Sequence, residues 1–153
     1  MAAKVATVWA NLVSAVEAIN GTSPYTHDLS GSGRVGREWV DSPAIEPPYA
    51  LVVFGEARTR HDVEIGAYRR DLIFWVVGWG EVAADTPTAR AEAALNMADD
   101  LLRAIEKDRT LSGTVYDVLS DLTSFVGAEP QTGDQYAVTV LRVECYLRVD
   151  TGI

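Results

Sequence analysis

The segment Gly31–Gly36 matches the G-x-G-x-x-G pattern that binds the pyrophosphate of dinucleotide cofactors. Such glycines follow a strand and open a helix, whose N-terminal amides face the anion. Here a helical pattern that ends at Asn20-Gly21 precedes them, and Pro43, Pro47 and Pro48 follow. Proline interrupts a helix, so the context favours a hairpin or loop tip, and we expect no cofactor. An NAD enzyme is the alternative, and Gly33→Val would abolish its nucleotide binding.

Both histidines lie beside an acid, in His27-Asp28 and in His61-Asp62. A catalytic zinc site needs about three convergent protein ligands. A histidine beside acids is equally typical of a solvated turn, so we expect no metal site. Cys145, the single cysteine, falls on the inward face of a predicted strand with no base beside it, as a core residue does.

Asp99 and Asp100 are adjacent on a predicted helix, where consecutive side chains point about 100° apart. They therefore do not form a working carboxylate pair. The sequence also contains no P-loop, G-x-S-x-G or H-E-x-x-H pattern. We accordingly expect no catalytic residue and no enzymatic activity.

The composition is that of one soluble globular domain, with 153 residues, 48% of them hydrophobic and 23% charged. No apolar run is long enough to span a membrane, no secretory signal is recognisable, and a single cysteine fits a reducing cytoplasm. The net charge is −9, with thirteen acids against six bases in residues 81–153. An acidic chain is a poor ligand for nucleic acid, but it can line a passage through which DNA slides.

Helical spacing of apolar residues predicts helices over residues 3–19 and 86–107. Asp85 or Thr86 is expected to cap the second helix, with Pro87 in its first turn. Residues 22–48 are rich in glycine, serine, proline and charge, and they are too long for a plain connector. We expect them to form a long mobile hairpin or arm.

Strand patterns follow at residues 49–57, 69–80, 114–119 and 135–149, with Arg58–Ala67 expected to be an exposed turn. Both faces of the second of these strands are apolar, so the helices should cover one face and another subunit could cover the other. The element order predicts an α+β fold, a mostly antiparallel sheet of about four to five strands packed against two main helices.

Three tryptophans lie outside the helical stripes, and six of the thirteen bases fall between positions 34 and 70. Tryptophan is enriched at the hot spots of protein interfaces. The candidate subunit interface therefore consists of Arg34, Arg37, Trp39, Arg69, Arg70, Trp75 and Trp79. Trp75 and Trp79 could equally be ordinary core residues.

Three stretches carry a resemblance to a known family. They are Tyr25–Leu29 followed by Gly-Ser-Gly-Arg-Val, Arg70–Gly80 leading through Asp85-Thr86-Pro87 into Asp99–Ile105, and Ala137–Val143. With these motifs, and in element order, length and acidity, nearly the whole chain resembles the tail terminator proteins of long-tailed bacteriophages. These small proteins cap a finished tail tube.

The resemblance implies a single α/β sandwich domain over residues 1–153, with an irregular arm at about 22–48, that closes into a hexameric ring. Such a ring ends tube polymerisation and offers the surface that joins the head. The implied partners are further copies of the chain, the tail tube protein and a head-completion or neck protein, without any membrane. DNA would pass through the ring without specific binding, and the candidate interface would contact a neighbouring subunit or the tube. The implied location is the head–tail junction of the virion, after assembly in the host cytoplasm.

Two further alternatives stay open. Another neck or head-completion ring protein would have the same size, acidity and ring closure. A monomeric α+β domain that binds a small ligand near Trp75 and Trp79 would instead show saturable quenching of tryptophan fluorescence.

Overall fold

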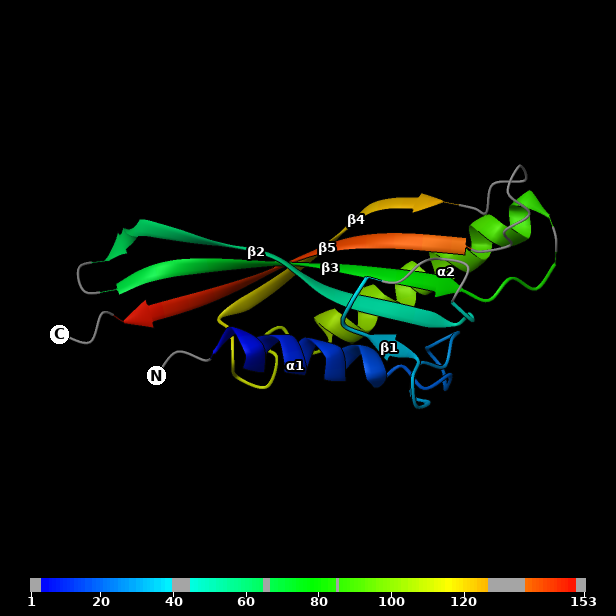
Figure 1. Cartoon of the computed structure of the whole chain (residues 1–153), viewed down its shortest axis with the longest axis horizontal. Helices are drawn as coiled ribbons and strands as arrows, with labels where there is room; N and C mark the ends of the chain where they lie inside the picture. The colour runs from blue at the N-terminus through cyan, green and yellow to red at the C-terminus, as the bar shows by residue number, and fades with distance from the viewer. Residues whose placement is uncertain (1–3, 40–44, 65–66, 85, 127–136, 151–153) are drawn as a thin grey trace.

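The computed structural model describes residues 4–39, 45–64, 67–84, 86–126 and 137–150. Two helices, α1 (Val5–Glu17) and α2 (Pro87–Glu106), pack against a mixed five-stranded sheet (Figure 1). The sheet order is β1-β2-β3-β5-β4, and the strands are β1 (Val35–Gly36), β2 (Tyr49–Glu64), β3 (Ala67–Gly80), β4 (Asp117–Val126) and β5 (Ala137–Asp150). Only the short β1 is parallel to its neighbour. The predicted α+β fold with a mostly antiparallel sheet is therefore confirmed.

Two strand predictions were wrong. β2 continues to Glu64 within the Arg58–Ala67 stretch, which the sequence predicts to be a turn, and it pairs with β3 as far as Glu64↔Ala67. β4 begins at Asp117 rather than at Thr114. Figure 1 shows the distal ends of β2, β3 and β5 extending past the N-terminal end of α1. Because neither helix extends over that ribbon, its side chains need not alternate between apolar and polar, and the usual strand pattern is missing.

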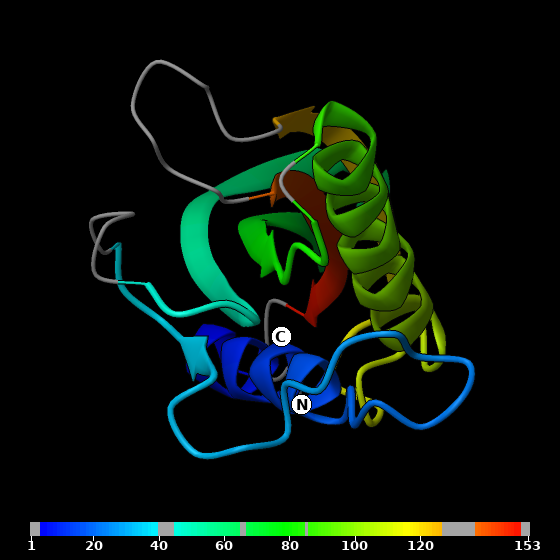
Figure 2. The same ribbon diagram turned by 90° about the vertical axis from the view of Figure 1, so that its right-hand side faces the viewer.

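The main core lies between the helices and one face of the sheet (Figures 1 and 2). It includes Val8, Leu12 and Val16 of α1, Met97, Leu101 and Ile105 of α2, and Phe74, Val76, Leu141 and Val143 of the sheet. Burial of each large apolar side chain contributes about 1.5–3 kcal/mol. Trp9 is only partly buried at the edge of this core, where its indole N–H donates to the Val52 carbonyl over 2.8 Å.

The start of α2 is fixed by local chemistry. Thr86 is the N-cap, as predicted, and its hydroxyl accepts a hydrogen bond from the Ala89 amide at 3.1 Å. Gly78 and Gly80 of β3 then let the helix approach the sheet closely. A Cβ at Gly80 would lie 2.6 Å from the Ala93 carbonyl oxygen, so only glycine fits there.

The arm at 22–48 is irregular, as predicted, apart from β1, and its residues 40–44 lie outside the described part of the chain. Its G-x-G-x-x-G segment ends in β1, not in a helix, so the context that a dinucleotide site requires is not met. The arm is joined to the body by a bridge between Asn20 and Asp28 and by pairing of Val35 with Ala50.

Candidate assembly surface

The face of the sheet opposite the helices divides into an apolar half and a charged half. The apolar half is a second buried cluster of Ile45, Leu51, Val53, Val77 and Trp79, with Tyr49, Val138 and Val140 packed against it. Both faces of β3 are therefore apolar from Leu72 to Trp79, as predicted. Trp79 is 4% exposed within the single chain, and its ring lies 5.9 Å from that of Tyr49. Among the described residues, its indole N–H has no hydrogen-bond partner.

The charged half centres on Asp71, whose side chain is 1% exposed. Its carboxylate accepts hydrogen bonds from the Nε atoms of Arg60, at 2.9 Å, and Arg69, at 2.6 Å. Arg60 and Arg69 stand directly opposite each other on β2 and β3. Like charges in that position repel, and the shared carboxylate offsets this repulsion.

A second ion pair lies beside the first on β5. Glu144 accepts hydrogen bonds from Arg142 and from the hydroxyl of Tyr146, both at 2.9 Å. Burial raises the pKa of Glu144, but these hydrogen bonds outweigh it and leave the pKa below its ordinary value. The guanidinium of Arg69 lies 4.4 Å from the centre of the Tyr146 ring, which joins the two ion pairs into one network.

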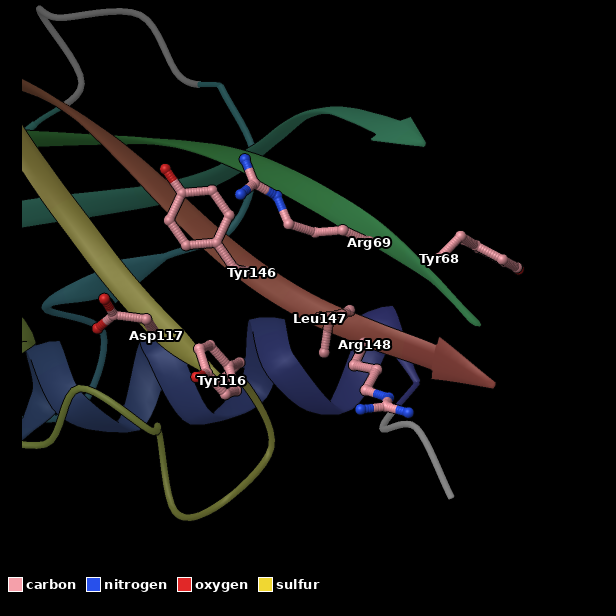
Figure 3. Close-up of a pocket in the computed structure, with 7 residues that line it drawn as sticks. All are labelled: Tyr68, Arg69, Tyr116, Asp117, Tyr146, Leu147 and Arg148. Atoms are coloured by element: carbon pink, nitrogen blue, oxygen red, sulfur yellow. The ribbon is translucent and has the colours of Figure 1, made fainter. Parts of the chain in front are cut away.

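A hollow of about 470 Å³ borders this network where β4 begins (Figure 3). Its lining residues are Tyr68, Arg69, Tyr116, Asp117, Tyr146, Leu147 and Arg148. Tyr116 is 83% exposed, although its amide donates to the Tyr146 carbonyl at 2.7 Å. Asp117 is held by two hydrogen bonds of 2.8 Å from Arg109. The hollow thus combines an exposed aromatic ring with fixed charges.

The arm is anchored elsewhere, by the buried carboxylate of Asp100 on α2. The Asp100 carboxylate accepts hydrogen bonds from the amides of Thr26 and His27, at 3.0 and 2.8 Å, and lies 3.1 Å from the His27 ring Nδ1. Burial raises the pKa of Asp100, but the bonds from His27 and Thr26 bring it below its ordinary value. Asp99 points to solvent and pairs with Arg103, so the two carboxylates diverge as predicted.

The structure does not bring the seven predicted interface residues into one patch. Arg34, Arg37 and Trp39 belong to the arm, where Arg34 donates to the Glu46 and Pro48 carbonyls, Arg37 lies over the Trp9 ring, and Trp39 is 64% exposed. The others belong to β3, where Arg70 contacts Tyr68 and alternation of side chains places Arg69, Trp75 and Trp79 on the opposite face. Trp75 is only partly buried.

Sequence reasoning missed the residues that organise this surface. The roles of Asp71 and Tyr146 depend on strand register, and that of Asp100 depends on contact with a distant arm. An acid within the apolar Arg70–Gly80 strand was the one signal that could have identified Asp71, because an acid in a buried strand needs a partner.

Cys145 is fully buried, and burial raises its pKa to about 12, so the thiol stays protonated at neutral pH. Within the described residues, no three acids, histidines or cysteines come together as a metal site. The side chains of His61 and Asp62 lie outside the described part. Neither described helix is both long and apolar enough to cross a membrane.

No protein-family model matches the chain, and a search of curated proteins finds no significant match.

Proposed function

We propose that this chain is a structural protein of a long-tailed bacteriophage that forms a ring, caps the tail tube, ends its polymerisation and provides the surface for head joining. The observation that carries the proposal is the pair of sheet edges. Within the described residues, β4 pairs only with β5, and β2 pairs only with β3 except at Ala50 and Leu51, which meet β1.

Both edge strands expose large apolar side chains. They are Phe54 on β2, Leu119 and Leu122 on β4, and Tyr116 immediately before β4. A long edge with exposed apolar side chains invites pairing with another strand, and a monomeric protein usually protects such an edge. These edges therefore support a function in assembly rather than in catalysis.

The strand directions support ring closure. Three antiparallel steps separate β2 from β4, so these two edges run in opposite directions. When a second copy is generated by rotation about an axis roughly parallel to the strands, its strands keep their directions. β2 of one copy therefore runs antiparallel to β4 of the next copy, and the two can pair. Such a contact joins two different surfaces, which is the heterologous contact that builds rings. The hexameric number follows from the resemblance to tail terminators.

The other parts of the molecule fit this function. In the ring, we expect the arm to contact a neighbouring subunit or the tube, with Trp39 as its exposed aromatic residue. Four described arginines of the helix-free face pair with acids, namely Arg58, Arg60, Arg69 and Arg142. DNA passing through the ring would meet few strong contacts. The joining partners would be the tail tube protein and a head-completion or neck protein.

The test is to add the purified chain to tail tubes assembling from the tube protein of its own virion, and to image them by electron microscopy. We expect tubes that stop growing and carry a ring at one end. Tubes that elongate unchanged while the chain stays in solution would contradict the capping function. A neck protein would form rings without binding tube ends, and a small-ligand domain would form no rings.

A further inference from the structure

The hollow beside Tyr116 lies where the sheet is one strand short. The pairing of β4 with β5 ends at Asp117↔Tyr146, whereas β3 pairs with β5 as far as Ala67↔Asp150. The stretch of β5 that β4 leaves uncovered therefore begins at Leu147, which lines the hollow together with Arg148 (Figure 3).

The opposite edge of the sheet has the complementary shape. Arg58 stands opposite Asp71, Asp71 opposite Tyr146, and Tyr146 opposite Asp117, so these residues share one level across the four strands. β2 continues beyond that level from Thr59 to Glu64. β2 thus extends along the sheet past the level at which β4 begins.

We propose that the hollow receives the distal end of β2, from Thr59 onward, of a second copy of this chain. The proposal rests on the proposed ring. We place β2 of one copy beside β4 of the next with Arg58 level with Asp117. The part of β2 beyond Arg58 then passes the start of β4, one strand spacing out from β5, and turns inward into the hollow. The partner is therefore another subunit, and the contact is the corner of the subunit interface.

The side chains on the two sides are complementary. Arg60, in the entering part of β2, is about half exposed, at 55%, although its Nε donates to Asp71. The hollow presents the exposed ring of Tyr116, and arginine binds well over a tyrosine ring. The chain already makes this contact twice in the same region, with Arg69 over Tyr146 and Arg70 over Tyr68.

A pair of cysteines tests this contact. Thr59→Cys and Tyr116→Cys are combined in one chain, where three strand spacings of about 4.8 Å separate the two edges. That separation exceeds the reach of a disulfide, about 7 Å between Cα atoms, so a bond can form only between copies. The buried Cys145 stays in place, and the wild type, oxidised in the same way, is the control for any link that Cys145 forms.

Under mild oxidation we expect covalent dimers and larger species up to the size of the ring, which return to monomer on reduction. The matched control combines Thr59→Cys with Leu95→Cys, because Leu95 is an exposed residue of the helix α2 and belongs to neither edge strand. This control should remain monomeric on a denaturing gel. Tyr116→Ser should raise the concentration at which the ring forms by about tenfold or more, as truncation of an interface hot spot does, and Leu95→Ser should not.

The outcomes separate this contact from the ring itself. If the chain forms a ring by mass, but Thr59→Cys/Tyr116→Cys gives no link and Tyr116→Ser has no effect, the contact is wrong and the ring stands. A chain that is monomeric at every concentration and gives no link overturns both proposals.

Discussion

Two buried carboxylates lie on opposite sides of the sheet and are neutralised in different ways. Asp100, on α2, is held by two backbone amides and a histidine ring of the arm. Asp71, on the helix-free face, is held by two arginines whose side chains are 55% and 38% exposed. Both carboxylates are almost inaccessible, but only Asp100 is surrounded by groups that are themselves fixed.

The difference shows what each carboxylate does. The partners of Asp100 belong to one short segment, so it fixes the position of that segment on α2. The partners of Asp71 come from two neighbouring strands with like charges, so it allows Arg60 and Arg69 to stand side by side on the candidate assembly surface. Asp100 therefore fixes the conformation of the arm, and Asp71 sets the charge of the helix-free face.

The largest expected effect is that of Asp100→Ala. The substitution removes the acceptor of the buried His27 amide and of the part-buried Thr26 amide, and such a loss costs about 3 kcal/mol of unfolding free energy. Urea unfolding followed by tryptophan fluorescence measures it. Amide hydrogen exchange should also show the arm around Thr26 opening.

Asp99→Ala is the matched control, because Asp99 is the exposed neighbour and forms only a surface pair with Arg103. Its effect should stay within about 0.5 kcal/mol. Equal effects of the two substitutions would contradict the anchoring role of Asp100.

A smaller loss, about 2 kcal/mol, is expected for Asp71→Asn, because half-exposed arginines can turn toward water. The repulsion left between Arg60 and Arg69 is screened by salt. The loss should therefore shrink in 1 M sodium chloride, as measured by urea unfolding at both salt concentrations. For Asp100→Ala it should not shrink. If the loss for Asp71→Asn is the same at both salt concentrations, the carboxylate does not act by offsetting the repulsion between Arg60 and Arg69.

How far the sequence predicts these two sites depends on the range of the interactions involved. The two helices and the Thr86 cap follow from local spacing, and the structure has both helices within two residues of their predicted bounds. The burial of Asp100 depends on an arm more than seventy residues away, which no periodicity shows. The pairing of Asp71 depends on the register of β2, and the sequence pattern ends that strand too early because its distal half is not covered by a helix.

The pH dependence of stability should also distinguish Asp100. Its pKa is lowered in the folded state, so its stabilisation is fully present above the unfolded pKa of about 4 and is lost as pH falls through the lower folded pKa. The difference in unfolding free energy between wild type and Asp100→Asn should be constant from pH 6 to 8. Below pH 4 it should fall by at most about 1.4 kcal/mol per pH unit. A difference that grows on acidification would contradict this sign.

The smallest effect is expected for Tyr146→Phe. It removes one hydrogen bond to a partly exposed carboxylate, at a cost of less than about 1 kcal/mol. The loss of that bond should raise the pKa of Glu144, which NMR titration of its side-chain carboxyl would measure. An unchanged pKa would mean that Arg142 alone holds the carboxylate.

Solution mass tests the central claim, assembly through the two sheet edges, most directly. Native mass spectrometry or light scattering would be run over a concentration series, because ring formation depends on concentration. We expect a closed species at six times the 16.6 kDa chain mass. A species of 16.6 kDa at every concentration would contradict it.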